Sequence, residues 1–417
     1  MNSTGNNGIS SGNNNPLENR TDAISDVFVH CPENTFLFLA GVSKTWKTAW
    51  LSSGRPRNTS VRLAATTKSR TEWIIGEPSF DFVAAPLGGI FCLAAQEGNL
   101  GGLHAAAKAY GSSRWISRHV GRWVIECAAG GGHLHVVRWA REKGCPWNEY
   151  ACRCAAWGGH LEVLAWVRGQ GCPWNEQTCR AAAQAGHLKV VQWARENGCP
   201  WDENTSSSAA RGGHLDVLMW VREQGCPWDE RTCSSAAGGG HLAVLEWARE
   251  QGCPWSRVTC AYAAEGGHLA VLVWAREHGC PWDEGTCSAA AAGGHLKVLQ
   301  WLRDQDCPWD VGTCVYAAEG GHLELLRWAR DKGCPWIDGL ICHSTAKGGH
   351  LDVLRWARAQ GCPWNESTCR VAAAGGHLEV LAWARKHGCP WDETTCSAAA
   401  EGGHLALLQW ARKHGCP

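Results

Sequence analysis

Residues 229–255 read DERTCSSAAGGGHLAVLEWAREQGCPW, and close copies of this stretch follow one another along most of the chain. Gly-His-Leu returns every 27 residues from His133 to His404, with a single step of 28 between His322 and His350. Cys-Pro-Trp keeps the same period from Cys145 to Cys389. Self-similarity at a fixed short period is typical of repeat proteins, in which each unit buries its apolar face against the next.

The second half of each unit predicts a helix that is covered on two sides. Counted from Leu242, the apolar residues cover roughly 220° of a helix at 100° per residue; they are Val244, Leu245, Trp247 and Ala248. Only Ala243 and Glu246 are expected to face water. Arg249 falls in the last turn, Gly252 is the expected C-terminal cap, and Pro254 stops the helix.

The first half of each unit predicts a shorter helix with a small-residue centre. We expect it to run from Glu230 to Ala237, with Asp229 as the N-cap and Glu230 in the first turn, where a negative charge is favourable. Alanines in its centre allow neighbouring helices to approach closely. One helix pair cannot bury its apolar face alone, so the pairs are expected to stack into one elongated domain.

The repeat resembles the ankyrin repeat. Its Thr-Cys-x-x-Ala-Ala-x-x-Gly-His-Leu-x-Val-Leu core matches the Thr-Pro-Leu-His-x-Ala-Ala and Gly-His-Leu-Glu-Val-Val segments of that family, over residues 89–417. The resemblance implies an all-α, ankyrin-like solenoid of about eleven 27-residue repeats plus a degenerate N-terminal repeat. The unit is shorter than the 33 residues of the family, which implies that the projecting finger is reduced to the Cys-Pro-Trp turn.

Outside the array the composition changes several times. Residues 1–20 are rich in Asn, Ser and Gly and predict a disordered tail. Residues 21–52 predict a small helical segment, 53–88 a linker, 89–126 a degenerate capping repeat, and 127–417 the repeat array.

The segment 21–52 resembles an F-box. It has an apolar helix, Pro32, a Leu-rich helix and then Val42-Ser-Lys-Thr-Trp46, where that family has Val-Cys-Arg-x-Trp. The opening Leu-Pro of the family is absent. This resemblance implies binding to a Skp-type adaptor; the alternative is a helical cap packed on the solenoid.

Composition excludes several classes of protein. Lys and Arg total 39 and so do Asp and Glu, so the zero net charge argues against a nucleic-acid binder. No apolar run is long enough to span a membrane, and the polar N-terminus has no secretory core. The sequence therefore predicts a cytoplasmic or nuclear protein whose cysteines are reduced thiols.

The residues that recur in every repeat have structural explanations. Zinc sites usually pair cysteines two to four residues apart, whereas Cys226 and Cys233 are seven apart and Ser206 replaces one copy. We therefore expect buried thiols, no metal and no cofactor. The repeated His predicts a hydrogen bond to a neighbouring loop backbone, and the repeated Trp residues predict core packing. The repeated Arg and Asp-Glu predict solvated helix ends and ion pairs.

Because the repeats are nearly identical, the positions at which they differ from one another are the candidates for a binding site. On each first helix, the residue before Thr, the residue after Cys and the residue four further on lie on one face, at i, i+3 and i+7. The ankyrin resemblance places this face on the concave side, where an unidentified protein partner is expected to bind. The predicted contact residues are Gln177, Arg180, Gln184, Arg231, Ser234, Glu265, Glu319, Ser367, Arg370, Thr394 and Glu401.

No catalytic motif accompanies the repeats, so the sequence predicts a protein-interaction scaffold and no enzyme. The alternative is a substrate receptor of a cullin-type ubiquitin ligase, with the F-box-like segment holding the adaptor and the solenoid holding the target. The last helix keeps the apolar pattern of an internal copy, with Leu405, Leu407 and Leu408. An uncovered apolar face there predicts end-to-end self-association.

Overall fold

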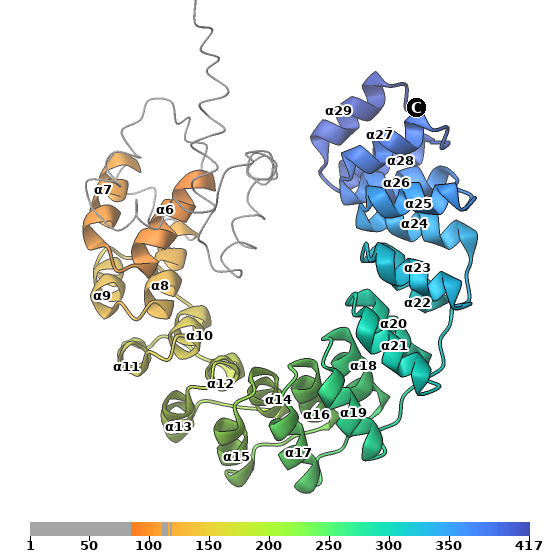
Figure 1. Cartoon of the computed structure of the whole chain (residues 1–417). Helices are drawn as coiled ribbons and strands as arrows, with labels where there is room; N and C mark the ends of the chain where they lie inside the picture. Colours follow the sequence, from red (N-terminus) through yellow and green to blue (C-terminus); the bar gives the residue numbers. More distant parts are fainter. Residues whose placement is uncertain (1–84, 111–115, 117–118) are drawn as a thin grey trace, which may run out of the picture. The chain divides into compact units, whose positions relative to one another are not determined.

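The computed structural model describes residues 85–110, 116 and 119–417, and within these residues the regular secondary structure is helical (Figure 1). The tail 1–20, the F-box-like segment 21–52 and most of the linker 53–88 lie outside the described residues. The all-α class predicted from the repeat is confirmed for the described part of the chain.

Each repeat is a pair of antiparallel helices, and one pair, α6 (Ala85–Gln96) and α7 (Leu100–Tyr110), precedes the regular copies. The first helices of the pairs are α8 (Val120–Gly130), α10 (Glu149–Trp157), α12 (Glu176–Gln184), α14 (Glu203–Gly212), α16 (Glu230–Gly238), α18 (Arg257–Glu265), α20 (Glu284–Ala292), α22 (Val311–Glu319), α24 (Asp338–Gly348), α26 (Glu366–Gly375) and α28 (Glu393–Glu401). The second helices are α9 (Leu134–Glu142), α11 (Leu161–Gly169), α13 (Leu188–Glu196), α15 (Leu215–Glu223), α17 (Leu242–Glu250), α19 (Leu269–Glu277), α21 (Leu296–Asp304), α23 (Leu323–Asp331), α25 (Leu351–Ala359), α27 (Leu378–Lys386) and α29 (Leu405–Lys413).

The helix ends follow the capping signals in the sequence. Asp229 precedes α16 and its side chain accepts a hydrogen bond from the backbone nitrogen of Arg231, at 2.9 Å. This bond satisfies one of the free N–H groups of the first turn. Gly252 follows α17 with φ +78°, a left-handed conformation that glycine adopts at little cost. The predicted N-cap and C-terminal glycine are therefore confirmed.

The start of the array is helical. The stretch 89–126, predicted as a degenerate capping repeat, contains all of α7 and the beginning of α8. Helix α8 begins at Val120, ahead of the expected array start at 127, and buries Ile125, Ala128 and Ala129 as later first helices do.

By their contacts the residues fall into two compact units. The first contains the described residues up to 182 together with 189–200, and the second contains 183–188 and 201–417. In the first unit, α8 packs against both α6 and α10. In the second unit, the first helices from α14 to α28 each pack against the next, and they form one layer while the second helices form the other (Figure 1).

Small side chains bring the first helices close together. In α16, Cys233, Ala236 and Ala237 are fully buried between neighbouring helices. The second helices contribute the larger core side chains, such as Leu245 and Leu272, which are also fully buried. The core of each unit therefore lies between the two layers and between successive pairs.

The Gly-Gly-His turns join successive repeats. His241 Nε2 donates to the backbone oxygen of Arg211 in the preceding repeat, at 3.1 Å. A Cβ atom added at Gly239 would lie 2.6 Å from the same oxygen. The expected structural hydrogen bond is confirmed, and the same contact is made by His133, His160, His268, His322, His377 and His404.

Each Cys-Pro-Trp turn after the first, at the end of the helix pair opposite the Gly-Gly-His turn, contacts the Cys-Pro-Trp turn of the preceding repeat. Cys253 is fully buried, and its thiol donates to the backbone oxygen of Asp229 in the preceding turn, at 3.4 Å. In the first of these turns, burial disfavours the thiolate of Cys145 and raises its pKa to about 12. Among the described residues no group of three His, Cys, Asp or Glu side chains could hold a metal ion. Its burial and its hydrogen bond make the Cys253 thiol a packing and hydrogen-bonding group.

The repeated Arg and Trp residues form a wedge between successive second helices, and this corrects the sequence-based interpretation. The Arg222 guanidinium lies 4.4 Å from the centre of the Trp228 ring, and its Nη1 donates to the backbone oxygen of Cys226 at 3.4 Å. Trp228 meets Trp247 of α17 edge to face, with ring centres 5.9 Å apart. The Arg residues were expected in ion pairs and the Trp residues in the core. Both Trp228 and Trp247 remain partly exposed.

Candidate functional site

The eleven predicted contact residues lie on first helices but differ in exposure. Arg231, Glu265, Arg370, Thr394 and Glu401 are exposed. Five others are half-buried: Gln177, Arg180, Gln184, Glu319 and Ser367. The predicted contact residues therefore differ in how much of each side chain a partner could reach.

Ser234 is the exception, because it is 3% exposed. Its hydroxyl donates to the backbone oxygen of Glu230 at 2.9 Å and lies 3.4 Å from Thr259 Oγ1 of α18. A short side chain at this position is covered by the next first helix. This burial leaves little of the predicted contact residue Ser234 for a partner to reach.

The same three positions in α10 carry an aromatic cluster that the sequence reasoning missed. Tyr150, Arg153 and Trp157 take the i, i+3 and i+7 positions, with Tyr150 and Trp157 exposed by 40% and 43%. The Arg153 guanidinium lies 5.5 Å from the Tyr150 ring centre, and its Nη1 donates to Gln177 Oε1 at 3.4 Å. Extending the i, i+3, i+7 pattern by one repeat toward the N-terminus would have found this cluster.

Two exposed tyrosines lie on first helices of the second unit. Tyr262 of α18 and Tyr316 of α22 follow the helix Cys by two positions and are 42% and 49% exposed. They lie beside the i, i+3, i+7 positions, so a search restricted to those positions passed over them.

A buried carboxyl group lies next to the α10 cluster. Glu126 of α8 has a side chain only 18% exposed, and its Oε1 lies 3.2 Å from Arg122 Nε. Burial raises the pKa of Glu126 to about 7, although the charges of Arg122 and Arg153 act in the opposite direction. Removal of water from the carboxylate therefore outweighs the nearby positive charges.

Substituting Glu126 by Gln should stabilise the protein at pH 8 and have little effect at pH 4. The folded pKa of about 7 exceeds the ordinary value of 4.5, so the stability that Glu126 contributes is present below pH 4.5 and is lost as the pH rises through 7. Gln cannot ionise, so we expect a gain of about 1–3 kcal/mol at pH 8, from urea denaturation. Glu142→Gln, on an exposed part of α9, is the control. An equal effect of Glu126→Gln at both pH values would contradict this assignment.

Ion pairs connect first helices across the face of the second unit. Lys347 of α24 lies 2.7 Å from Glu319 of α22, and Arg257 of α18 lies 3.2 Å from Asp283 before α20. His343 Nδ1 of α24 lies 3.2 Å from Ser367 Oγ. Burial and the charge of Arg370 lower the pKa of His343, which keeps its imidazole neutral near pH 7.

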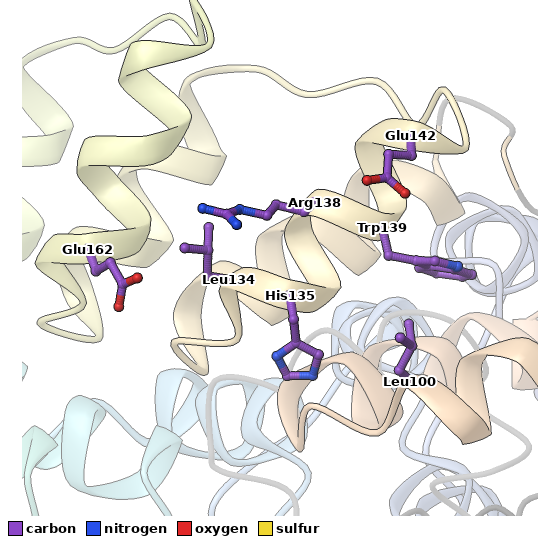
Figure 2. Close-up of a pocket in the computed structure, with 7 residues that line it drawn as sticks. All are labelled: Leu100, Leu134, His135, Arg138, Trp139, Glu142 and Glu162. Atoms are coloured by element: carbon purple, nitrogen blue, oxygen red, sulfur yellow. The ribbon is translucent and has the colours of Figure 1, made fainter.

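An open cleft of about 530 Å³ lies on the other layer, around α9 (Figure 2). Glu162 of α11 lies on one side of α9 and Leu100 of α7 on the other, as Figure 2 shows. Trp139 Nε1 donates to His104 Nε2 at 3.1 Å, so His104 takes the place of the turn tryptophan of later repeats. The residues that line the cleft are Leu100, Leu134, His135, Arg138, Trp139, Glu142 and Glu162.

Comparisons with known proteins add a structural likeness. No family model matches the chain, and no curated protein matches its sequence. Among solved structures, the chain is similar to the crystal structure of the human ASB11 ankyrin repeat domain. The identity is 18%, the match covers 38% of this chain and 84% of that domain, and the TM-score is 0.31. Within the described residues no helix is long and apolar enough to cross a membrane.

Proposed function

We propose that this helical-repeat protein binds a protein partner through the exposed face of its first helices. The observation that carries the proposal is the location of the exposed aromatic side chains. Tyr150, Trp157, Tyr262 and Tyr316 all lie on first helices, whereas the large apolar residues exposed on second helices are Met219, Leu378 and Leu405. Tyrosine, tryptophan and arginine are the residues that most often dominate binding energy at protein interfaces.

The internal contacts of the repeat support the same conclusion. The recurring His, Cys, Arg and Trp side chains have partners within the array, as His241, Cys253 and Arg222 illustrate. The repeats differ instead on the first helices, where α10 carries an Arg–Tyr pair and α24 and α26 carry a His–Ser contact. A face that varies while its supporting contacts repeat is suited to recognising one specific partner.

Charge reversal at two exposed arginines tests the proposal. We expect Arg231→Glu with Arg370→Glu to remove most partner capture in an affinity purification read by quantitative mass spectrometry. Both residues are exposed, so the melting temperature should hardly change, because such substitutions usually cost under about 0.5 kcal/mol. The matched control is Lys189→Glu with Lys297→Glu, on exposed positions of second helices. Equal capture by both double variants would overturn the proposal.

The ubiquitin-ligase role rests on the F-box-like segment 21–52, outside the described residues. It predicts that deleting residues 21–52 removes a Skp-type adaptor from the purified complex while the partner of the array is retained. Retention of the adaptor by the deleted chain would reject this role. An intracellular location remains a prediction; the described cysteines are all free thiols.

End-to-end self-association also remains a prediction, with a changed set of residues. In α29, Leu407 and Ala411 are buried, whereas Leu405 is 68% exposed. Leu408 and Trp410 pack partly against Cys396, Ala411 and Cys416. Leu405 is therefore the side chain to change, and Leu405→Lys should reduce any concentration-dependent light scattering.

A further inference from the structure

Four side chains on α18 and α22 form a row of alternating aromatic rings and carboxylates. Tyr262 and Tyr316 follow the helix Cys by two positions, and Glu265 and Glu319 follow it by five. Helix α20 packs between α18 and α22. We call these four residues the tyrosine–glutamate row.

Helix α20 leaves room along this row. Where its neighbours carry tyrosine and glutamate, α20 has Ala289 and Ala292, and its other face positions are Gly285 and Ser288. No side chain on this face of α20 is therefore larger than that of serine. A chain lying across the row can contact both tyrosines and Glu265.

The ring of Tyr262 is supported from one side by the preceding repeat. A Cβ atom added at Gly238 of α16 would lie 3.4 Å from Tyr262 Cβ and 3.6 Å from Cδ2, so the ring lies alongside the Gly238 backbone. The ring is nonetheless 42% exposed. An aromatic ring that is held in place and still open to solvent loses little conformational freedom on binding.

The charges near the row leave a negative excess. Arg257 pairs with Asp283 at 3.2 Å, and Glu319 pairs with Lys347 at 2.7 Å. Among the residues that the structure describes, Glu265 and Glu284 have no basic group within ion-pair distance. Both are exposed. The potential at the row therefore favours a positively charged ligand.

We propose that the tyrosine–glutamate row binds a basic, extended peptide segment of the protein partner, with an arginine placed against the tyrosine rings and paired with Glu265. The guanidinium is planar, stacks on aromatic rings and forms strong hydrogen bonds with carboxylates, so it suits both kinds of group in the row. The inference rests on the proposed function and specifies the chemistry of the partner.

The spacing of the repeats sets the length of this segment. Neighbouring helices pack 8–10 Å apart, so two repeat steps separate the tyrosines by roughly 20 Å. An extended chain rises about 3.3 Å per residue, so roughly six residues span the row.

Synthetic peptides test the proposal directly. The probes are fluorescein-labelled nine-residue Gly-Ser peptides with three arginines, and matched peptides with three glutamates, measured by anisotropy on the full chain at low salt. We expect the arginine peptide to bind at least tenfold more tightly than the glutamate peptide. Tyr262→Ala, Tyr316→Ala and Glu265→Gln should each weaken binding several-fold, whereas Met219→Ala on α15 and Glu324→Gln on α23 should not.

The outcomes separate this inference from the proposed function. Equal binding of the two peptides, or binding that survives all three row substitutions, would overturn the basic-segment inference. If the row variants still capture the cellular partner while Arg231→Glu with Arg370→Glu does not, the inference fails and the proposed function stands. If the arginine peptide binds at the row but the Arg231→Glu with Arg370→Glu variant captures the partner as well as its control does, the row binds basic peptides and the proposed function is overturned.

Discussion

Gly240→Ala should lower the free energy of unfolding by about 2–4 kcal/mol, because it combines backbone strain with a steric clash. Gly240 has φ +77°, and a Cβ atom there would lie 2.6 Å from Nδ1 of His268 in the next repeat. The His268 ring cannot move freely, because its Nε2 donates to the backbone oxygen of Gly238 at 3.1 Å. Urea denaturation followed by circular dichroism measures the loss.

Gly252 provides the matched control for this substitution. It has φ +78°, but a Cβ atom there would meet nothing within 4 Å. Gly252→Ala therefore reports the left-handed backbone alone, at about 1 kcal/mol. In a chain that already carries His268→Ala, Gly240→Ala should lower the free energy of unfolding by less than it does in the unaltered chain. If Gly240→Ala and Gly252→Ala cost the same, the contact between the turn and the next histidine ring is not a determinant of stacking.

The helix pairs could be predicted because the same helix and capping signals recur in every repeat. The helix starting at Glu230, the Asp229 cap and the Gly252 end each follow from local chemistry within one unit. The histidine hydrogen bond could also be inferred as a class of contact. Its acceptor could not, since the carbonyl lies 30 residues away and is defined only once two helix pairs are stacked.

The contacts of the repeated Arg and Trp residues depend on how successive helix pairs stack, which the repeat sequence does not indicate. The sequence shows that Arg222, Trp228 and Trp247 recur, but their separations along the chain do not indicate that they meet. They meet because the turn before α16 lies between α15 and α17, where the Trp228 ring contacts both neighbours. The apolar arc predicted that both side chains would be buried. This is correct for Leu245, which is fully buried, whereas Trp247 is only partly buried.

The candidate binding face was only half predictable for a related reason. Variable positions can be read from the repeats, but exposure depends on the neighbouring copy. Ser234 is covered because α18 lies against it, whereas Tyr262 is exposed beside Gly238, which has no side chain to cover it.

Trp247→Ala should destabilise the second unit by about 2–4 kcal/mol, below the full cost of a buried tryptophan because the ring is partly exposed. The substitution removes the edge-to-face contact with Trp228 and leaves the contact of that ring with Arg222 in place. A double-mutant cycle with Trp228→Ala should give a coupling of about 0.5–1.5 kcal/mol. Additive effects of the two substitutions would show that the rings do not support one another.

The loss should also be confined to the neighbourhood of the wedge, since repeat arrays are stabilised by contacts between adjacent units. Hydrogen exchange should therefore accelerate in α15, α16 and α17 of the Trp247→Ala variant, while α27 and α28 exchange as in the unaltered chain. The equivalent substitution Trp383→Ala in α27 is the reciprocal control, because Trp383 meets Trp364 with ring centres 5.7 Å apart. It should reverse the pattern, with faster exchange around α27. If both variants exchange faster along the whole second unit, the unit unfolds as one block, and the wedges act on global stability instead of on the joint between two repeats.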